Sequence, residues 1–309
     1  MFQAPEFSGA FSFVLLTVIL PHATIYPGKA MLPNPIRKKI DFMYRFGFVG
    51  AGNMATAIFG GILNSGILSP AEICVTDISE EKSAAFAAKG AVALEGCAKV
   101  MEQSEIVLLA VKPQNIESVL TQMAPFYTSD KIIVSIAAGI SAACIRRLLS
   151  CENAKVILVM PNTPMLIGFG SIAMSHDSLV SAEEFAFVKS IFSAAGEVEE
   201  IPANLMNEVI PINGSSPAFI YLFAKLVSEY SDKLGIPYET ANRLFCNTLI
   251  GSAQMMLQTD KTHQQLIDMV TSPGGTTFAM LDALKECDFA HAVDASFDRC
   301  IKRAYELGK

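Results

Sequence analysis

The sequence has few histidines and no cysteine pair with the spacing of a metal site. Its four histidines share no ligand spacing with one another or with a cysteine, so we predict no metal. Its seven cysteines, an odd number, include no Cys-x-x-Cys pair. Unpaired thiols are typical of a reducing compartment. We therefore expect buried free cysteines and a cytoplasmic protein.

Basic surface is also lacking. Charged residues make up 17% of the chain and the net charge is −7. The one dense cationic run, residues 37–39, lies outside the part that we expect to fold. Nucleic acid is bound by basic patches, so this class of partner is excluded. With 51% apolar residues in 309, the sequence is typical of a globular protein of two domains.

No apolar run is long enough to cross a membrane. "FSFVLLTVIL" (11–20) is closed by Pro21, well short of the ~20 residues that a spanning helix needs. It is similar to the apolar part of a signal peptide, but Glu6 is the only charge before it, where a signal peptide has cations. We expect translation to begin at Met43, with residues 1–42 as a wrongly assigned extension. A disordered extension is the second interpretation and a membrane anchor the third.

A glycine-rich turn follows the first strand-like segment. In "YRFGFVGAGNMATAIFGGILNSG" (44–66) an apolar run leads through Gly50, Gly52 and Ala55 into a helical pattern. The first glycine permits a tight turn and the second lets a pyrophosphate approach the backbone. The small third residue allows the helix to pack closely on the strand. Strand, turn and helix in this order predict a dinucleotide site.

The next strand-like run, "EICVTD", ends in Asp77. This is about the offset at which a carboxylate hydrogen-bonds the ribose 2′-OH of the cofactor. The alternative is that Asp77 caps a helix beginning near Ser79. No arginine follows, and Glu80 and Glu81 would repel a 2′-phosphate. The expected cofactor is NADPH or NADH, and the acidic residues favour NADH.

Three near-continuous apolar runs follow, at residues 105–111, 131–137 and 155–160. Such runs suit parallel strands covered on both faces, and ligands bind beyond the carboxyl ends of such strands. The turns after them should therefore line the nicotinamide end of the site. Lys112 is either a solvated lysine or a cofactor or substrate contact. Asn162, between two prolines, either satisfies its own turn or presents polar groups to the ring.

Beyond residue 202 the patterns become helical. We expect one long helix over 203–235, kinked at residues 214–217, and further helices over 238–258, 262–270 and 289–307. Thr262 and Gln265 have the spacing of a capping box. Met255 and Met256 are expected in the core. Because more apolar side chains lie on these helices than one layer can bury, we expect a homo-oligomer built from this half.

A second glycine loop opens one of these helices. "VTSPGGTTFAMLDALKE" (270–286) places two glycines and two threonines before a helical pattern. Backbone N–H groups at a helix N-terminus bind anions. Since the cofactor already has a loop, we interpret this one as a cup for a substrate carboxylate.

Six motifs in chain order resemble the pyrroline-5-carboxylate reductase family: "FGFVGAGNMATAI", "LLAVKPQ", "SIAAGIS", "MPNTP", "NGSSPAF" and "TSPGGTT". The resemblance covers residues 43–309. It implies an α/β fold in which a parallel-sheet Rossmann domain (43–202) precedes an all-helical substrate and dimerisation domain (203–309). It also implies reduction of the cyclic imine 1-pyrroline-5-carboxylate to L-proline by NAD(P)H, in dimers that assemble further into pentamers of dimers.

The resemblance assigns roles by position. It implies pyrophosphate contacts from Gly50, Gly52, Asn53 and Met54, a ribose contact from Asp77, and a nicotinamide site lined by Ala110, Val111, Lys112, Pro113, Ala137, Ala138 and Gly139. It implies a substrate site of Ser272, Gly274, Gly275, Thr276 and Thr277. Family members commonly have glycine where this chain has Ser216.

Reduction of an imine needs little acid–base catalysis from side chains, because the protonated imine is already electrophilic. We expect Thr277 to hydrogen-bond the ring nitrogen, or simply to cap its helix, and Lys112 to orient the substrate. The rival functions are a two-domain hydroxyacid dehydrogenase, which typically has a lysine on the long second-domain helix, and another cyclic-imine reductase. Here the first lysine after Gly214 is Lys225, two to three turns on.

Overall fold

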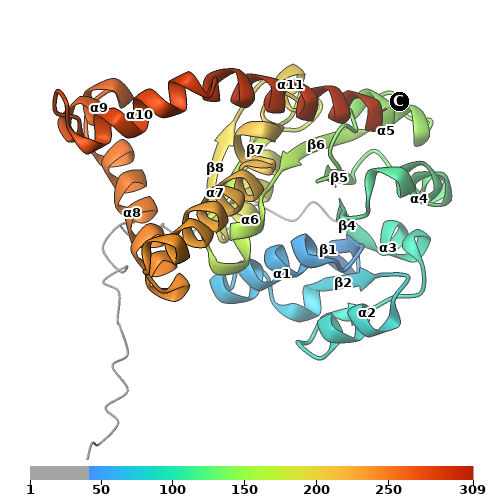
Figure 1. The fold of residues 1–309 in the computed structure, drawn as a ribbon. Helices are drawn as coiled ribbons and strands as arrows, with labels where there is room; N and C mark the ends of the chain where they lie inside the picture. The colour runs from blue at the N-terminus through green and yellow to red at the C-terminus, as the bar shows by residue number, and fades with distance from the viewer. Residues whose placement is uncertain (1–41, 309) are drawn as a thin grey trace, which may run out of the picture. The chain divides into compact units, whose positions relative to one another are not determined.

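The structure, a computed structural model, describes residues 42–308. The expected extension lies outside these residues except for Phe42, so its nature stays a prediction. The described residues belong to one structural unit, coloured from blue to red in Figure 1.

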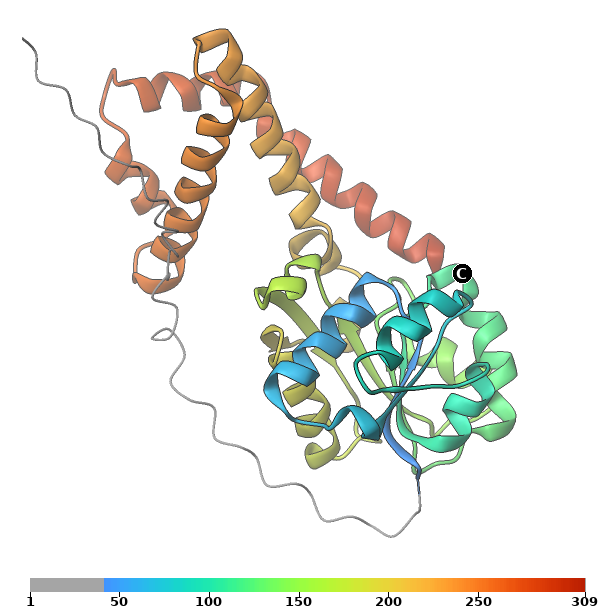
Figure 2. The same cartoon turned by 90° about the horizontal axis from the view of Figure 1, so that it is seen from below.

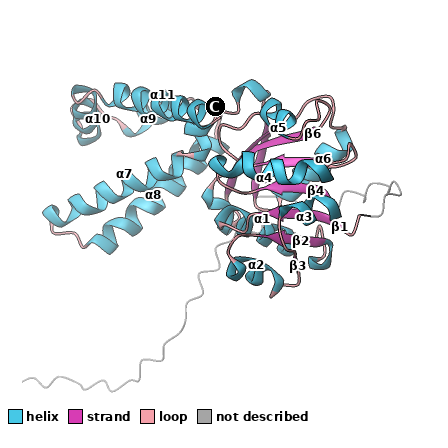
Figure 3. Ribbon diagram, turned by 90° about the vertical axis from the view of Figure 1, so that its right-hand side faces the viewer, coloured by secondary structure: helices cyan, strands magenta, loops and turns pink. Residues whose placement is uncertain are grey.

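The first half of this unit is built on a sheet with the strand order β3-β2-β1-β4-β5-β6-β7-β8 (Figure 3). The strands are β1 (Tyr44–Val49), β2 (Ile73–Thr76), β3 (Val92–Ala93), β4 (Ser104–Leu109), β5 (Ile132–Ser135), β6 (Lys155–Met160), β7 (Gly170–Ser175) and β8 (Gly196–Glu200). Strands β1 to β6 pair in parallel. The expected runs near 105–111, 131–137 and 155–160 are thus confirmed as β4, β5 and β6, whereas β7 and β8 were not expected. Strand β7 runs antiparallel to β6.

Helices cover both faces of the sheet. Side chains alternate between the two faces along each strand, so one strand contributes residues to two buried clusters. In β4, Ile106 and Leu108 join one buried cluster, and Val107 and Leu109 join the other. The first cluster contains residues of α1 (Asn53–Ser65), α2 (Glu80–Ala87) and α6 (Ala182–Ser193). The second contains residues of α3 (Cys97–Gln103), α4 (Ile116–Met123) and α5 (Ala142–Leu148). This double covering explains why the strands read as continuous apolar runs.

After Glu200 the described chain contains helices and no further strand. The helices are α7 (Ser216–Ser231), α8 (Tyr238–Gln258), α9 (His263–Val270), α10 (Thr276–Glu286) and α11 (Phe289–Leu307). The helices expected at 238–258, 262–270 and 289–307 are confirmed, and α9 begins with the expected capping box of Thr262 and Gln265. A domain boundary between residues 202 and 203 remains our proposal.

The single helix expected over 203–235 is wrong. The chain forms a short turn at Ala203–Leu205 and a π-helix at Ile210–Gly214 before α7 begins. Pro211 and Pro217 lack the N–H that a continuous α-helix needs, and wider π turns take up such interruptions. The hydroxyl of Ser216 donates to the Pro211 carbonyl oxygen at 2.6 Å, so the residue that departs from the family pattern stabilises this turn.

The apolar residues of the helical half are not buried within one chain. Met255 and Met256, expected in the core, are 41% and 48% exposed. Helix α8 buries only Ala241. Most apolar residues of α7 and α10 are likewise exposed, so the helical half presents a broad apolar surface. Among the described residues no helix is both long and apolar enough to span a bilayer.

Candidate active site

The first glycine loop joins β1 to α1. Gly50 has φ +101°, and a side chain there would lie 2.7 Å from the Ala110 carbonyl oxygen, so glycine is required. Gly52 is the N-cap of α1 and faces open space where a side chain would stand. No side chain caps α1, so the first N–H groups of the helix, among them those of Asn53 and Met54, lack an intrahelical acceptor. The loop therefore has both the room and the donors that a pyrophosphate requires.

Asp77 follows β2 and fixes this loop. Its Oδ2 accepts a hydrogen bond from the Ala51 backbone N–H at 2.7 Å, and its Oδ1 accepts one from Ser79 N–H at 2.8 Å. The second bond closes a turn just before α2, whose N-cap is Ser79 and which has no side-chain capping bond, so Asp77 does not take the capping role considered as the alternative. Each carboxylate oxygen has a further lone pair, so a ribose contact is compatible with both bonds.

Two loops at the carboxyl ends of β4 and β5 lie beside the glycine loop. Ala110 N–H donates to the Val49 carbonyl oxygen at 2.8 Å, and Ile136 N–H donates to Leu109 at 3.3 Å, which ties the three strand ends together. Lys112 is exposed, and within residues 42–308 no carboxylate forms an ion pair with it. Its ammonium group is therefore available to a ligand at this edge of the sheet.

Asn162 is largely buried and its amide is engaged. Its Oδ1 accepts from Ser171 N–H at 2.9 Å, and its Nδ2 donates to the Asn213 carbonyl oxygen at 3.2 Å. Asn213 in turn donates to the carbonyls of Met160 and Ser171. These bonds join the turn after β6 to the π-helix. They engage the Asn162 amide within the chain, but they do not satisfy its own turn, and a contact with the nicotinamide ring stays a prediction.

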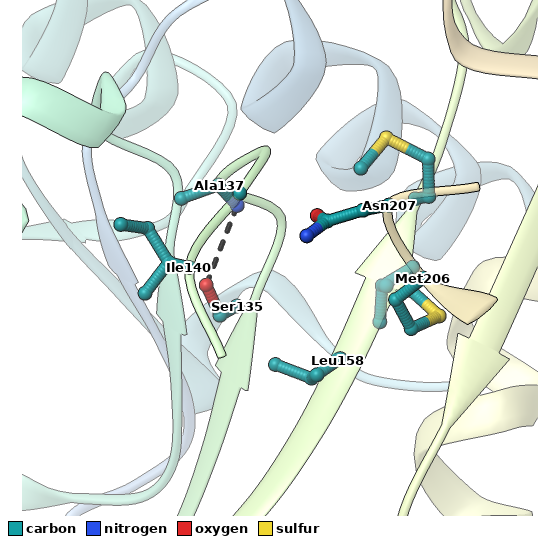
Figure 4. A pocket seen from close by; sticks show the side chains of 9 residues that line it. Ser135, Ala137, Ile140, Leu158, Met206 and Asn207 are labelled. Atoms are coloured by element: carbon teal, nitrogen blue, oxygen red, sulfur yellow. Dashed lines mark hydrogen bonds between the residues drawn. The ribbon is translucent and has the colours of Figure 1, made fainter. Parts of the chain in front are cut away.

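A small pocket lies under the loop that follows β5. Its walls include Ser135 at the end of β5, Ala137 and Gly139 from the loop, and Met206 and Asn207 from the helical segment. Figure 4 shows the Asn207 side chain reaching across the pocket towards Ala137. Sequence reasoning missed Asn207, because only the folding of the 203–214 segment against the sheet brings it here.

The expected substrate cup precedes α10. Gly274 has φ +70°, a conformation that favours glycine, and Gly275 N–H donates to the Ser272 carbonyl oxygen at 2.9 Å. Gly275 is the N-cap of α10, with no side-chain capping bond. Thr277 is the second residue of the helix, so the capping role considered for it is wrong. The first N–H groups of α10 therefore have no side-chain acceptor and are the donors that the expected cup requires, while the roles expected for Ser272, Thr276 and Thr277 stay predictions.

The cup is far from the cofactor loops of its own chain. Helix α11 follows α10 and ends against Gly139, where Ala304 and Gly308 contact the loop backbone. The 19 residues of α11 make it about 28 Å long. Figures 1 and 2 show α9 and α10 at the opposite end of α11 from the sheet. The two glycine loops therefore lie in different parts of one chain, the first on the sheet and the second beyond the far end of α11.

Other ligand chemistry is sparse in the described part of the chain. It contains no group of three or more metal-ligating side chains. All seven cysteines are unpaired there, but only Cys74 and Cys97 are buried. Burial raises the pKa of the Cys74 thiol to about 11, which keeps it protonated and unreactive. The expectation of buried thiols is wrong for Cys287, which is exposed.

The parallel sheet, the glycine loop and the helical half together define a nicotinamide-dependent oxidoreductase with a Rossmann-type half and a helical half. Two family models match the chain: "Pyrroline-5-carboxylate reductase dimerisation" over residues 203–307 and "NADP oxidoreductase coenzyme F420-dependent" over residues 45–139. Pyrroline-5-carboxylate reductase of Escherichia coli is 35% identical over 266 residues, which cover 86% of this chain and 98% of that protein. The enzyme of Methanosarcina acetivorans is 33% identical with the same coverage.

Solved structures agree. The crystal structure of Plasmodium falciparum pyrroline carboxylate reductase with NADP bound superposes with a TM-score of 0.79 at 28% identity, covering 87% of this chain and 99% of that one. The chain belongs to the pyrroline-5-carboxylate reductase family. Membership confirms the expected fold class, a Rossmann-type sheet followed by a helical dimerisation region, and the expected activity of an NAD(P)H-dependent pyrroline-5-carboxylate reductase. The dimerisation region supports homo-oligomers, and the cofactor is a nicotinamide nucleotide.

Proposed function

We propose that the chain reduces 1-pyrroline-5-carboxylate to L-proline at a site made by two copies. The glycine loop of one copy, from Gly50 to Met54, holds the cofactor, and the cup of another copy, from Ser272 to Thr277, holds the imine. One observation carries this proposal: the chain has two open helix N-termini, and α11, which is about 28 Å long, runs between the end of α10 and the sheet half.

The residues of the cup suit a cyclic imine acid. The substrate carboxylate is held by the N–H groups at the start of α10, where the helix dipole favours an anion. The Thr277 hydroxyl hydrogen-bonds the ring nitrogen, since it can both donate and accept. Lys112 orients the substrate from the side of the cofactor. The bound nicotinamide cofactor supplies the hydride, so these residues only position the imine and exclude water.

The nicotinamide end is lined by Ala110, Val111, Pro113 and the loop of Ala137, Ala138 and Gly139. Asn162 acts from behind this wall, through its bonds to Ser171 and Asn213. Lys225, the first lysine after Gly214, lies on α7 two to three turns beyond it, and this spacing counts against the lysine of a hydroxyacid dehydrogenase.

We propose NADH as the preferred cofactor. Asp77 ends β2, and Glu80 and Glu81 form the first turn of α2 beside it. A 2′-phosphate carries nearly two negative charges and would meet all three carboxylates. The P. falciparum relative holds NADP, so a ratio of kcat/KM for NADH over NADPH above one is the test that separates this chain from that relative. A ratio below one overturns the preference.

For the assembly, we propose dimers formed through α7, α8 and α10 and a further assembly into pentamers of dimers. The exposed apolar residues Phe219, Leu226, Leu244 and Phe278 support the dimer contact, because such a surface is unfavourable in water. Light scattering on the purified protein distinguishes dimer from decamer. The cytoplasmic location stays a proposal that rests on the unpaired cysteines.

An absorbance assay of NADH and NADPH oxidation tests the reaction itself. Purified protein is mixed with pyrroline-5-carboxylate, with other cyclic imines, or with a hydroxy acid and the oxidised cofactor. Rapid oxidation with pyrroline-5-carboxylate is expected. Turnover of the hydroxy acid alone would overturn the proposal, and faster turnover of another imine would change the substrate.

A further inference from the structure

The last two turns of α11 touch the backbone of the loop after β5. Gly139 has φ +82°, and a methyl group there would overlap the Ala304 carbonyl oxygen. A methyl group at Gly308 would overlap the Gly139 carbonyl oxygen. The two backbones are therefore in direct contact, with no space for a side chain between them. Ala304, 3% exposed, is the only residue of α11 that is buried in the single chain.

The same turns hold the opposite wall of the pocket. The Tyr305 hydroxyl donates to Glu208 Oε1 at 2.5 Å and also interacts with the Asn207 side chain. The bond to Glu208 raises the pKa of Tyr305, so the hydroxyl stays a donor at neutral pH. Asn207 faces Ala137 across the pocket (Figure 4). The end of α11 thus contacts the loop after β5 through its own backbone, and it contacts the segment of Asn207 and Glu208 through the Tyr305 side chain.

The sequence of α11 suits this close approach. Cys300, Ala304 and Gly308 recur every four residues and so lie on one face of the helix. The Cys300 sulfur lies 3.4 Å from the Ser215 hydroxyl oxygen at the end of the π-helix. Small side chains along this face let the helix pack against the loop and the π-helix at once.

We propose that Gly308 and Tyr305 are positioning residues for hydride transfer, because they set the distance between the loop of Ala137 to Gly139 and Asn207. The loop assignment rests on the proposed function. The last turns of α11 then fix where the nicotinamide ring can lie, although none of their atoms touches the reacting carbon. A displacement of the loop by even part of an ångström misaligns the ring and the imine.

Gly308→Ala is the sharpest test. Gly308 has φ −88°, which alanine adopts freely, so only the contact with Gly139 changes. We expect the KM for NADH to rise about tenfold and kcat to fall less. The dissociation constant of ADP-ribose, which reaches only the Gly50–Asp77 end, should stay within about twofold of the wild type. Gly60→Ala is the matched control, since Gly60 faces open space on α1, and it should leave all three constants unchanged.

Tyr305→Phe gives a second, milder variant that keeps the ring and removes the hydroxyl. We expect a rise of about threefold in the KM for NADH, again without a change in ADP-ribose binding. Equal losses of NADH and ADP-ribose affinity in Gly308→Ala would show a global disturbance and overturn the proposal, as would unchanged NADH constants in both variants. The dissociation constant of NADH, titrated without the imine, should rise in step with its KM, so this outcome is distinguishable from a failure of the proposed reaction, which the wild-type assay reports.

Discussion

The two halves of the chain differ in how many of their apolar side chains a single copy buries. In the sheet half, Phe46, Phe48 and Ile58 have no exposed surface. In the helical half, α9 and α10 bury none of their residues and α8 buries one. A sheet covered by helices on both faces closes its own core. Helices without a covering layer leave their apolar side chains exposed. The helical half therefore needs a second copy to cover this surface.

The two glycine loops follow the same division. The cofactor loop is fixed from within its own half, by the Asp77 bond to Ala51 and the contact of Gly50 with Ala110. The substrate cup has well-defined donors but no partner surface in its own chain. If the proposed function is right, a cofactor binds to one copy, whereas reduction of the imine requires two.

The largest effect is expected when a charge is introduced into the exposed apolar surface of the helical half. Leu226→Glu places a charge on α7 at a side chain that is 54% exposed in the single chain. Burying an unpaired charge costs several kcal/mol, so we expect loss of the oligomer and a fall in turnover of more than about a hundredfold. NADH binding should persist. Gel filtration, the imine assay and an NADH titration measure the three effects.

Ala182→Glu, at the exposed start of α6, adds the same charge to the sheet half and serves as the control. It should change neither size nor rate. A fully active Leu226→Glu monomer would remove the distinction between the two halves.

The second effect separates catalysis from cofactor binding. Thr277→Ala removes the hydroxyl assigned to the ring nitrogen, and we expect kcat/KM for the imine to fall about thirtyfold with little change in NADH affinity. Thr277→Ser keeps the hydroxyl and should recover most of the rate. If the alanine variant has wild-type kinetics, Thr277 has no role in the site.

A smaller effect is expected at the ribose end of the sheet half. Glu80→Gln with Glu81→Gln removes two charges but leaves the Asp77 bond to Ala51 in place. We expect kcat/KM with NADPH to rise about fivefold relative to NADH at low salt, and less at high salt because exposed charges are screened. An unchanged cofactor ratio would show that these carboxylates do not read the phosphate.

The last effect concerns the stability of the sheet half rather than its activity. Lys131 is 2% exposed and donates to the carbonyl oxygens of Glu102 and Ser104. Burial lowers its pKa from 10.5 to about 8. Between these values the unfolded chain binds more protons than the folded one, so the free energy of unfolding should rise with pH from about 8 to 10.5. A shift from 10.5 to about 8 corresponds to a total rise of at most about 3 kcal/mol over this range.

Denaturant unfolding across this range measures the effect. Lys131→Met should lack the rise, and Lys89→Met, at an exposed lysine, should retain it. A wild-type protein whose stability is flat from pH 8 to 10.5 would contradict the lowered pKa.

Local patterns predicted much of this molecule. The helix at 289–307, the capping box of Thr262 and the strand at 155–160 are all encoded in neighbouring residues. Strand β8, "GEVEE", is mostly charged and becomes a strand only because β7 pairs with it, so no local pattern indicated it.

The candidate site was predictable to the same extent. Its two glycine loops are short motifs, and their backbone angles could be expected from sequence. The bond of Tyr305 to Glu208 joins residues 97 positions apart, and that of Asn162 to Asn213 joins residues 51 apart. Such contacts depend on how helices pack on the sheet, which sequence patterns do not encode.

Subunit mixing tests most directly whether the site is shared between two copies. Gly52→Val fills the open space of the cofactor loop, and Thr277→Ala disables the cup, so each variant alone should be nearly inactive. Coexpressed with two different tags, half of the dimers are mixed, and each mixed dimer retains one site with both parts intact. We predict recovery of about a quarter of wild-type activity in the mixture. Activity no greater than the sum of the two inactive parents would contradict a shared site.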